Sequence, residues 1–338
     1  MKKHLLKPPP NDAELLFLPS LKEVAEALDK QPVSLTAHQP YFFNPGVSLK
    51  FLLLQKLARQ KKFLFVDSDR LDLKANIPSS RGVRRLSCIE SQDILLDFPT
   101  PDKKVFDLFF ERAEEALSSG DSLRQAQKHF LRFKEIFYAR LTRPLLKEAL
   151  VESFLSFYGL EDDYSFVSDL VAGDDFKDFF ERIYKDADAF RETFNRSLEA
   201  YGREFSFRFK NFPFPKLEKG ELPFWLVRKG KRQRLFKDTF DQAKPGAMIL
   251  PRAATLTIFV RLYKSDLFVH GTGGANYEWV SDRLIEEFFA KKPPAYAVVS
   301  GTFLIEGFQE RDMPYFLFDP EKVKAVFNDL AALQTARL

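Results

Sequence analysis

Two hydrophobic patterns alternate in the first hundred residues, and together they predict strands joined by a helix. Short apolar runs at residues 33–37 and 63–66 are typical of buried strands in a parallel sheet. Between them, apolar residues occupy nearly every side of a predicted helix over residues 47–57. Such a helix should be buried against the sheet. The order strand, helix, strand predicts a βαβ unit.

The pattern changes between about residue 101 and residue 210. Here charged segments carry apolar residues at three- and four-residue spacing, which is typical of amphipathic helices. We expect roughly five helices, over residues 102–118, 122–138, 141–158, 174–184 and 186–201. This block reads as a helical insertion or lid.

Alternation of strands and helices returns after residue 211. The expected strands cover residues 222–227, 233–237, 266–270 and 295–300. The pattern at both ends of the chain therefore predicts an α/β core with a mostly parallel sheet. We expect residues 1–100 and 211–338 to form this core and residues 101–210 to interrupt it.

Composition narrows the class of protein. The 38 phenylalanines indicate a Phe-rich core rather than stacking platforms for bases, because no interleaving with basic residues stands out. A net charge of +4 is small for this length, so a nucleic-acid partner is not expected, although a basic run at 229–234 could meet phosphates.

Cysteine content and hydropathy bear on the compartment. The single cysteine, Cys88, excludes an intramolecular disulfide and a Cys-cluster metal site, and we predict no metal ligands. This suits a reducing cytoplasm. No apolar stretch is long enough to span a membrane, and the amino terminus does not read as a signal peptide. We therefore expect a cytoplasmic protein; its oligomeric state is left open.

The first candidate cluster lies in the turn that opens the buried helix. Its members are His38, Gln39, Asn44 and Gly46, with Lys50 about one turn into the helix. A helix amino terminus suits phosphate or carboxylate, and Lys50 could neutralise such an anion. His38 could donate to a phosphate or act as an acid or base. A proline-rich turn with a satisfied histidine is the alternative; four polar residues at one strand end favour function.

The second cluster, Asp67 and Asp69, follows the second strand. Two carboxylates here could hold a ribose, an amine or a metal. Equally, Asp69 and Arg70 could form a surface ion pair and Asp67 a cap. Both interpretations stay open at this point.

The third cluster follows the predicted strand 266–270 and precedes a predicted helix. It comprises His270, Gly271, Thr272, Gly273, Gly274 and Tyr277. Glycines let a backbone approach a ligand and form an anion-binding nest. His270 could be a core histidine, but we favour a ligand-binding role because the glycines leave room beside it. All three clusters should meet at one edge of the sheet.

Two arginines complete the candidate ligand-binding set. Arg252 follows a short apolar run and a proline, and Arg261 interrupts an apolar helix. An arginine in such a position is paired or reaches a ligand.

Two segments resemble known families. HQPYFFNPGVSLKFLLLQKLARQKKFLFVDSD resembles the start of WbqC-like proteins, which carry a His/Met-Gln-Pro turn and a strand ending in Asp. The same segment resembles the start of the BshC family, assigned to cysteine addition in bacillithiol synthesis. DLFVHGTGGANYEWVSDRLI resembles that family's late strand and Gly-Gly loop. This chain has His38-Gln39 where the BshC family has Gln-Gln, and it lacks the family's coiled coil.

The resemblance, over about a third of the chain, implies a Rossmann-like core with a helical insertion. It also implies a nucleotide-utilising transferase or ligase that joins an amino acid or similar amine to a small sugar-derived acceptor, with a nucleotide such as ATP as a possible cofactor. The WbqC-like resemblance implies instead an enzyme that handles sugar nucleotides in surface-polysaccharide synthesis. A non-enzymatic ligand-binding or nucleic-acid-associated protein is the third alternative. The catalytic candidates are His38, Asp67, Asp69 and His270.

Overall fold

The computed structural model describes residues 13–18, 20–41, 45–80, 82–119, 123–161, 163–204, 214–241 and 246–303. Its central sheet has the strand order β1-β11-β10-β2-β3-β6. These strands are β1 (Ala13–Leu18), β2 (Val33–His38), β3 (Gln60–Phe65), β6 (Tyr164–Phe166), β10 (Leu267–His270) and β11 (Ala295–Phe303). Neighbouring strands from β11 to β6 are parallel, and β1 pairs antiparallel with β11 at one edge.

Helices cover both faces of this sheet. The nearly all-apolar helix α2 (Pro45–Leu57) packs on one face, in the same buried cluster as Phe63 and Val269. Helices α10 (Ala253–Tyr263) and α12 (Glu278–Glu287) pack on the other, with Phe268 and Leu35. Adjacent strand residues alternate between faces, which explains how Phe268 and Val269 join different clusters.

The chain winds away from the centre of the sheet in two directions. From β2 it passes through α2 to β3, whereas from β10 it passes through α12 to β11 on the opposite side. The strand order therefore reverses between the neighbours β2 and β10. In open α/β sheets, ligands bind outside the carboxyl ends of the strands at such a switch point.

Two smaller antiparallel sheets flank the core. β4 (Arg70–Ser79) and β5 (Gly82–Ile94) form a long hairpin, and β7 (Glu221–Arg228) pairs with both β8 (Lys231–Phe236) and β9 (Met248–Pro251). A two-residue turn, Lys229–Gly230, joins β7 to β8, and both residues have positive φ, as the twist of such a hairpin demands.

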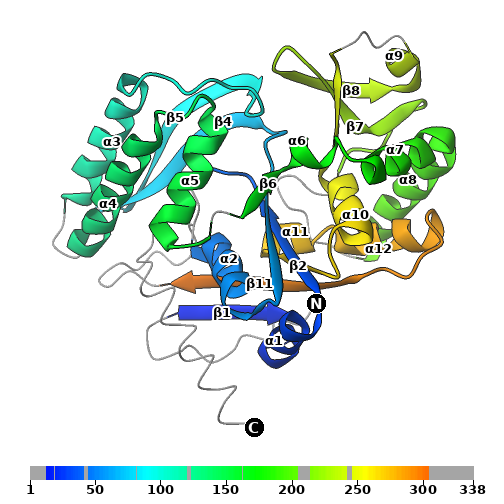
Figure 1. Ribbon diagram of the computed structural model, residues 1–338, viewed down its shortest axis with the longest axis horizontal. Helices are drawn as coiled ribbons and strands as arrows, with labels where there is room; N and C mark the ends of the chain where they lie inside the picture. The colour runs from blue at the N-terminus through cyan, green and yellow to red at the C-terminus, as the bar shows by residue number, and fades with distance from the viewer. Residues whose placement is uncertain are drawn as a thin grey trace.

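The remaining helices pack beside these sheets. In Figure 1, α3 (Lys104–Leu117), α4 (Arg124–Arg140) and α5 (Leu146–Tyr158) lie with the β4–β5 hairpin on the left. α7 (Asp174–Lys185), α8 (Ala187–Glu204) and α9 (Lys237–Asp241) lie with β7 and β8 on the right. The short helix α6 (Val167–Leu170) lies between the two groups, and α1 (Leu21–Lys30) lies below. Phenylalanine dominates the largest fully buried side chains, so the Phe-rich core is confirmed.

The α/β, mostly parallel, Rossmann-like fold is confirmed, with two corrections of detail. The strands at 222–227 and 233–237 belong to a separate antiparallel sheet and not to the central one. The block 101–210 contains all five expected helices, but it also contributes β6, which pairs with β3 in the central sheet. The boundaries of an insertion at 101–210 stay a prediction.

Candidate functional site

His38 and His270 end two neighbouring parallel strands at the switch point. The register pairs Val269 with Thr36, so both histidines lie at the same carboxyl-terminal edge of the sheet. His270 lies on the same face of the sheet as Phe268, two residues earlier. The two rings meet edge to face, with their centroids 4.3 Å apart. His38 pairs in register with Phe65, whose ring lies on the opposite, α2-covered face. The two imidazoles therefore belong to opposite faces at the point where the strand order reverses.

A hydrogen bond joins the first predicted cluster to the second. Gln39 Nε2 donates to Asp69 Oδ2 at 2.7 Å. The other carboxylate oxygen of Asp69 pairs with Arg232 of β8, whose Nη1 also donates to the Ser68 carbonyl at 2.9 Å. Segments that follow β2 and β3 thus meet the β7–β8 hairpin. The sequence indicated Arg232 only as part of a basic run.

The Asp67 side chain contacts α5 and α6 rather than the residues around Asp69. Its carboxylate is fully buried and pairs with Lys147 of α5 at 2.8 Å. It also accepts hydrogen bonds from Ser168, from the hydroxyl at 2.6 Å and from the backbone N–H at 3.2 Å. These contacts tie β3 to α5 and α6. They favour a structural role for Asp67, and its catalytic role stays a prediction.

His38 is a neutral imidazole with a defined orientation. Burial, together with the nearby positive charge of Lys50, lowers the pKa of His38 to about 3. Its Nδ1 lies 2.9 Å from the carbonyl oxygen of Gln39. A carbonyl only accepts, so Nδ1 carries the proton and Nε2 is the unprotonated nitrogen. At neutral pH the ring is therefore uncharged, and Nε2 can accept a hydrogen bond.

Lys50 lies beneath the same edge, on the α2 side. Its side chain is buried, and Nζ donates to the Ala37 carbonyl of β2 at 2.5 Å. Burial lowers the pKa of Lys50 to about 7. The ammonium lies against β2, five residues into the helix, and its predicted role of neutralising a ligand anion stays a prediction.

His270 belongs to a buried charge network. Its Nε2 contacts Glu278 of α12, and the same carboxylate pairs with Arg261 of α10. Arg261 also pairs with Asp282 at 2.7 Å and donates to the Pro294 carbonyl. Burial lowers the pKa of His270, an effect that the neighbouring Glu278 opposes. Arg261 is therefore paired within the protein, as one of its two sequence interpretations stated.

Glu278 and Asp282 were not among the predicted site residues. They stand four positions apart on α12, one helical turn, and so share the face that meets Arg261. A buried arginine on one helix and two carboxylates at this spacing on the next is a pattern that could have revealed the network.

The predicted glycine loop is a helical turn. Residues Thr272–Ala275 form the short helix α11, and no glycine from 271 to 274 has positive φ, so the expected anion nest does not form in this described segment. A Cβ at Gly274 would overlap Nδ1 of His270, whereas one at Gly273 would meet nothing within 4 Å. Gly274 therefore leaves room for the imidazole of His270. Its role in ligand binding stays a prediction.

Because His270 lies so close to Gly274, we expect alanine substitutions at Gly274 and at Gly273 to change the free energy of unfolding by different amounts. Gly274→Ala should lower the free energy of unfolding by about 1–3 kcal/mol, because His270 is buried and held by Glu278, so the ring cannot move aside cheaply. Gly273→Ala, the matched control, should be neutral or slightly stabilising. Urea denaturation of both variants makes the comparison. Equal stabilities for the two variants would show that His270 does not pack on Gly274.

Tyr277 links the third cluster to the second. Burial raises the pKa of its hydroxyl, and the negative charges of Glu278 and Asp69 raise it further, so the hydroxyl lies within electrostatic reach of both carboxylates. Its hydroxyl is hydrogen-bonded to Thr257. The polar groups at this edge thus form one set that runs from β10 to the segment after β3.

Arg252 lies farther along the β7–β9 sheet. It pairs with the buried Glu221 at 2.8 Å and donates from Nε to the Phe224 carbonyl at 3.1 Å. Arg252 and Arg232 both pack on the ring of Trp225, at 4.3 and 4.7 Å from its centroid. Trp225 therefore holds both guanidinium groups, one of which reaches Asp69.

The structure brings only some of the predicted site residues together. The residues at the switch-point edge are His38, Gln39, Lys50, Asp69, His270 and Tyr277. Asp67 and Arg252 are engaged by partners away from it, whereas Arg261 pairs with Glu278, the carboxylate that His270 also contacts. Gly46 is buried in the first turn of α2, and Asn44 lies outside the described residues.

Comparison with known proteins finds no matching family model and no similar curated protein. Within the described residues, no helix is both long and apolar enough to cross a membrane. The same residues contain no group of three or more His, Cys, Asp or Glu side chains placed to hold a metal ion.

Proposed function

We propose that this protein is a nucleotide-utilising transferase or ligase that joins an amino acid or similar amine to a small sugar-derived acceptor. One observation carries the proposal: polar groups from separate segments converge outside the carboxyl ends of β2 and β3, beside the switch point. This is the position at which doubly wound folds bind nucleotides. The resemblance to the BshC family points to the same class of reaction.

The parts of the site have separate roles in this proposal. The amino end of α2, the element that follows β2 in the chain, carries the positive end of the helix dipole, which favours a phosphate. Arg232, already at the edge through Asp69, supplies a guanidinium group that can form two parallel hydrogen bonds to phosphate. Asp69, oriented by Gln39, accepts from a ribose hydroxyl or from the amine. His38 Nε2, which is unprotonated at neutral pH, accepts a hydrogen bond from the amine and so orients it.

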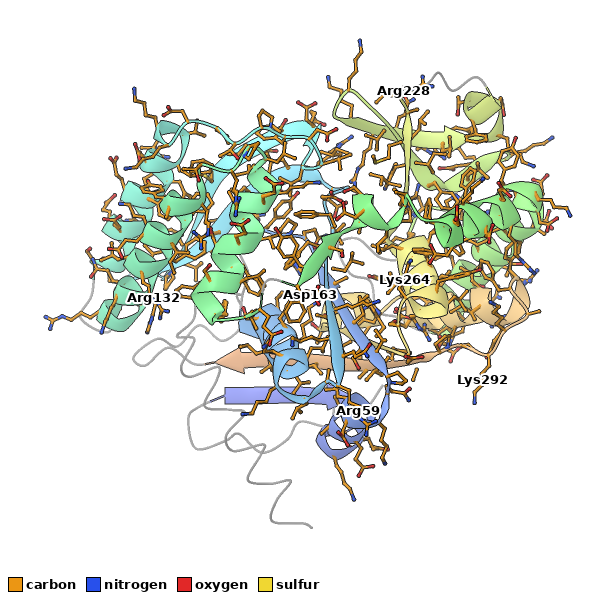
Figure 2. The ribbon with its side chains drawn as sticks, in the orientation of Figure 1. Arg59, Arg132, Asp163, Arg228, Lys264 and Lys292 are labelled. Carbon is orange, nitrogen blue, oxygen red and sulfur yellow. The ribbon has the colours of Figure 1, made fainter. Side chains whose placement is uncertain are left out.

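Binding of a nucleotide is the property to test first. A thermal-shift screen with ATP, sugar nucleotides and free amino acids should show stabilisation by a nucleotide. Arg232→Gln should then weaken binding of that nucleotide by about 10- to 100-fold, the effect of losing a charged hydrogen bond. The matched control is Arg228→Gln in the same hairpin, because Arg228 is exposed at the outer end of β7 (Figure 2). It should bind as the unchanged protein does.

The screen also separates the alternatives. Stabilisation by sugar nucleotides but not by ATP would support the WbqC-like function. Binding that weakens steeply with salt and does not depend on Arg232 or His38 would indicate a basic surface without a specific site. If no nucleotide stabilises the protein, the proposed function is wrong.

A further inference from the structure

Lys50 is a buried amine whose Nζ contacts the Ala37 carbonyl and the Phe51 ring but has no carboxylate partner among the described residues. Its side chain is only 2% exposed, although lysine is almost never fully buried without a partner. Its one hydrogen-bond acceptor within the described chain is the Ala37 carbonyl, which leaves further bonding capacity at Nζ. None of the carboxylates described lies within ion-pair distance of it.

The charged groups around Lys50 do not stabilise its ammonium form. The titratable side chains within electrostatic reach are His38 from β2 and His270 from β10, and the positive charge of Lys50 disfavours protonation of both. The pKa of Lys50 falls to about 7 through burial alone, without a compensating acid. The neutral amine, with its lone pair, is therefore far more populated near pH 7 than in an exposed lysine.

The position of Nζ matches a reactive group better than a structural one. Ala37 is the penultimate residue of β2, so Nζ lies at the carboxyl edge of the sheet, beside the switch point. Every other buried lysine or arginine described here has a carboxylate partner: Lys147 has Asp67, and Arg261 has Glu278. Lys50 contributes no comparable cross-link.

We propose that Lys50 is a nucleophilic amine that forms an imine with the carbonyl group of a small aldehyde or α-oxo acid. The lone pair of Nζ adds to the carbonyl carbon, and the carbonyl oxygen takes up a proton to give a carbinolamine. Loss of water then leaves a C=N bond, so one amine and one carbonyl yield one imine and one water. The two protons that Nζ loses leave with the carbonyl oxygen as that water molecule. This activity does not depend on nucleotide binding.

A desolvated lysine is suited to this chemistry because only its neutral form is a nucleophile. At pH 7 an amine with a pKa of 7 is half neutral, whereas a lysine with the ordinary pKa of about 10.4 is neutral in roughly one molecule in 2,500. Selectivity for Lys50 should therefore be greatest near neutral pH and should shrink as the pH rises.

Reductive trapping on the unchanged full-length protein tests the proposal. The probe is glycolaldehyde, small and uncharged, with cyanoborohydride at pH 7, and peptide mass mapping locates the product. Lys56, exposed on the same helix, is the internal reference. We expect labelling of Lys50 to exceed that of Lys56 by at least about tenfold at pH 7, and the ratio to fall at pH 9 as ordinary amines deprotonate.

The trapping experiment has one outcome that supports the proposal and one that overturns it. Preferential labelling at Lys50 that disappears in Lys50→Met and persists in Lys56→Met supports the proposal. Labelling of Lys56 equal to or greater than that of Lys50 at pH 7 overturns it, whether the cause is a charged or an inaccessible Nζ. Because the decisive ratio is measured within one wild-type polypeptide, it does not depend on the folding of a variant. Nucleotide stabilisation, measured separately, decides the proposed function independently.

Discussion

Lys50→Met should stabilise the protein at pH 7 by roughly 3–5 kcal/mol, although it removes a side chain at the candidate site. In the unfolded chain the amine keeps an ordinary pKa, whereas in the folded protein burial lowers the pKa of Lys50 from 10.5 to about 7. At pH 7 the unfolded chain binds a proton that the folded protein binds only weakly. Burial of this amine therefore lowers the free energy of unfolding by about 1.4 kcal/mol for each unit of pKa difference. Methionine fills a similar volume without a charge, and the lost hydrogen bond to Ala37 offsets only about 1 kcal/mol.

The stability difference between Lys50→Met and the wild-type protein should depend on pH. A lowered folded-state pKa means that the unfolded state binds more protons, so the wild-type protein gains stability as the pH rises from about 7 toward 10.5. The advantage of Lys50→Met should shrink over the same range. Urea denaturation of both proteins at pH 7, 8.5 and 10 measures it, with Lys56→Met as an exposed control expected within about 0.5 kcal/mol of wild type. A pH-independent difference would mean that burial does not shift this amine.

The loss of stability caused by burying Lys50 indicates that this lysine is kept for function. Proteins that place a group in a destabilising environment usually do so at a site that needs the altered chemistry. The helix that carries Lys50 is otherwise apolar, and its buried neighbours Leu49, Phe51 and Leu53 pack in the core. The sequence displayed the lysine within this apolar run, but only the structure shows that its Nζ meets a backbone carbonyl and no acid.

Long apolar patterns predicted the core of the fold well, because burial on both sides of a strand or all around a helix leaves a strong signal. β2, α2 and β3 are such elements, and they lie within a few residues of their expected bounds. β6 left little signal: it has three residues, and its membership of the sheet depends on pairing with β3, far away in the sequence. A short edge strand is specified by tertiary contacts rather than by its own pattern.

Part of the site could be predicted because the strands themselves could be predicted. Residues at strand ends could be placed at one edge, and the bond between Gln39 and Asp69 agrees with that expectation. Arg232 could not be placed, because the β7–β8 hairpin belongs to another sheet and its approach to Asp69 is a matter of three-dimensional packing. The packing of Gly274 against His270 could not be predicted, because a glycine required by a neighbouring side chain looks, in sequence, like one required by a ligand.

Glu278→Gln is the substitution from which we expect the largest loss of stability, about 3–5 kcal/mol. It leaves Arg261, which is 1% exposed, with the partly exposed Asp282 as its one remaining carboxylate partner in the described network, and it weakens the contact with His270. Removing one partner of a buried ion pair exposes the remaining charge to the low-dielectric interior. The matched control is Glu287→Gln on the same helix, where the carboxylate pairs with Arg196 and Arg283 at the surface. This exposed pair should contribute no more than about 1 kcal/mol.

A double variant separates loss of the ion pair from simple mispacking. Arg261→Met combined with Glu278→Gln removes both buried charges, so it should recover much of the stability that Glu278→Gln alone loses. Asp282 then loses its partner, but its carboxylate is partly exposed and can be hydrated. Chemical denaturation of the two single variants and the double variant gives the coupling energy directly. If the losses of the single variants simply add, the two side chains act independently, and the network does not hold α10 against α12 through charge.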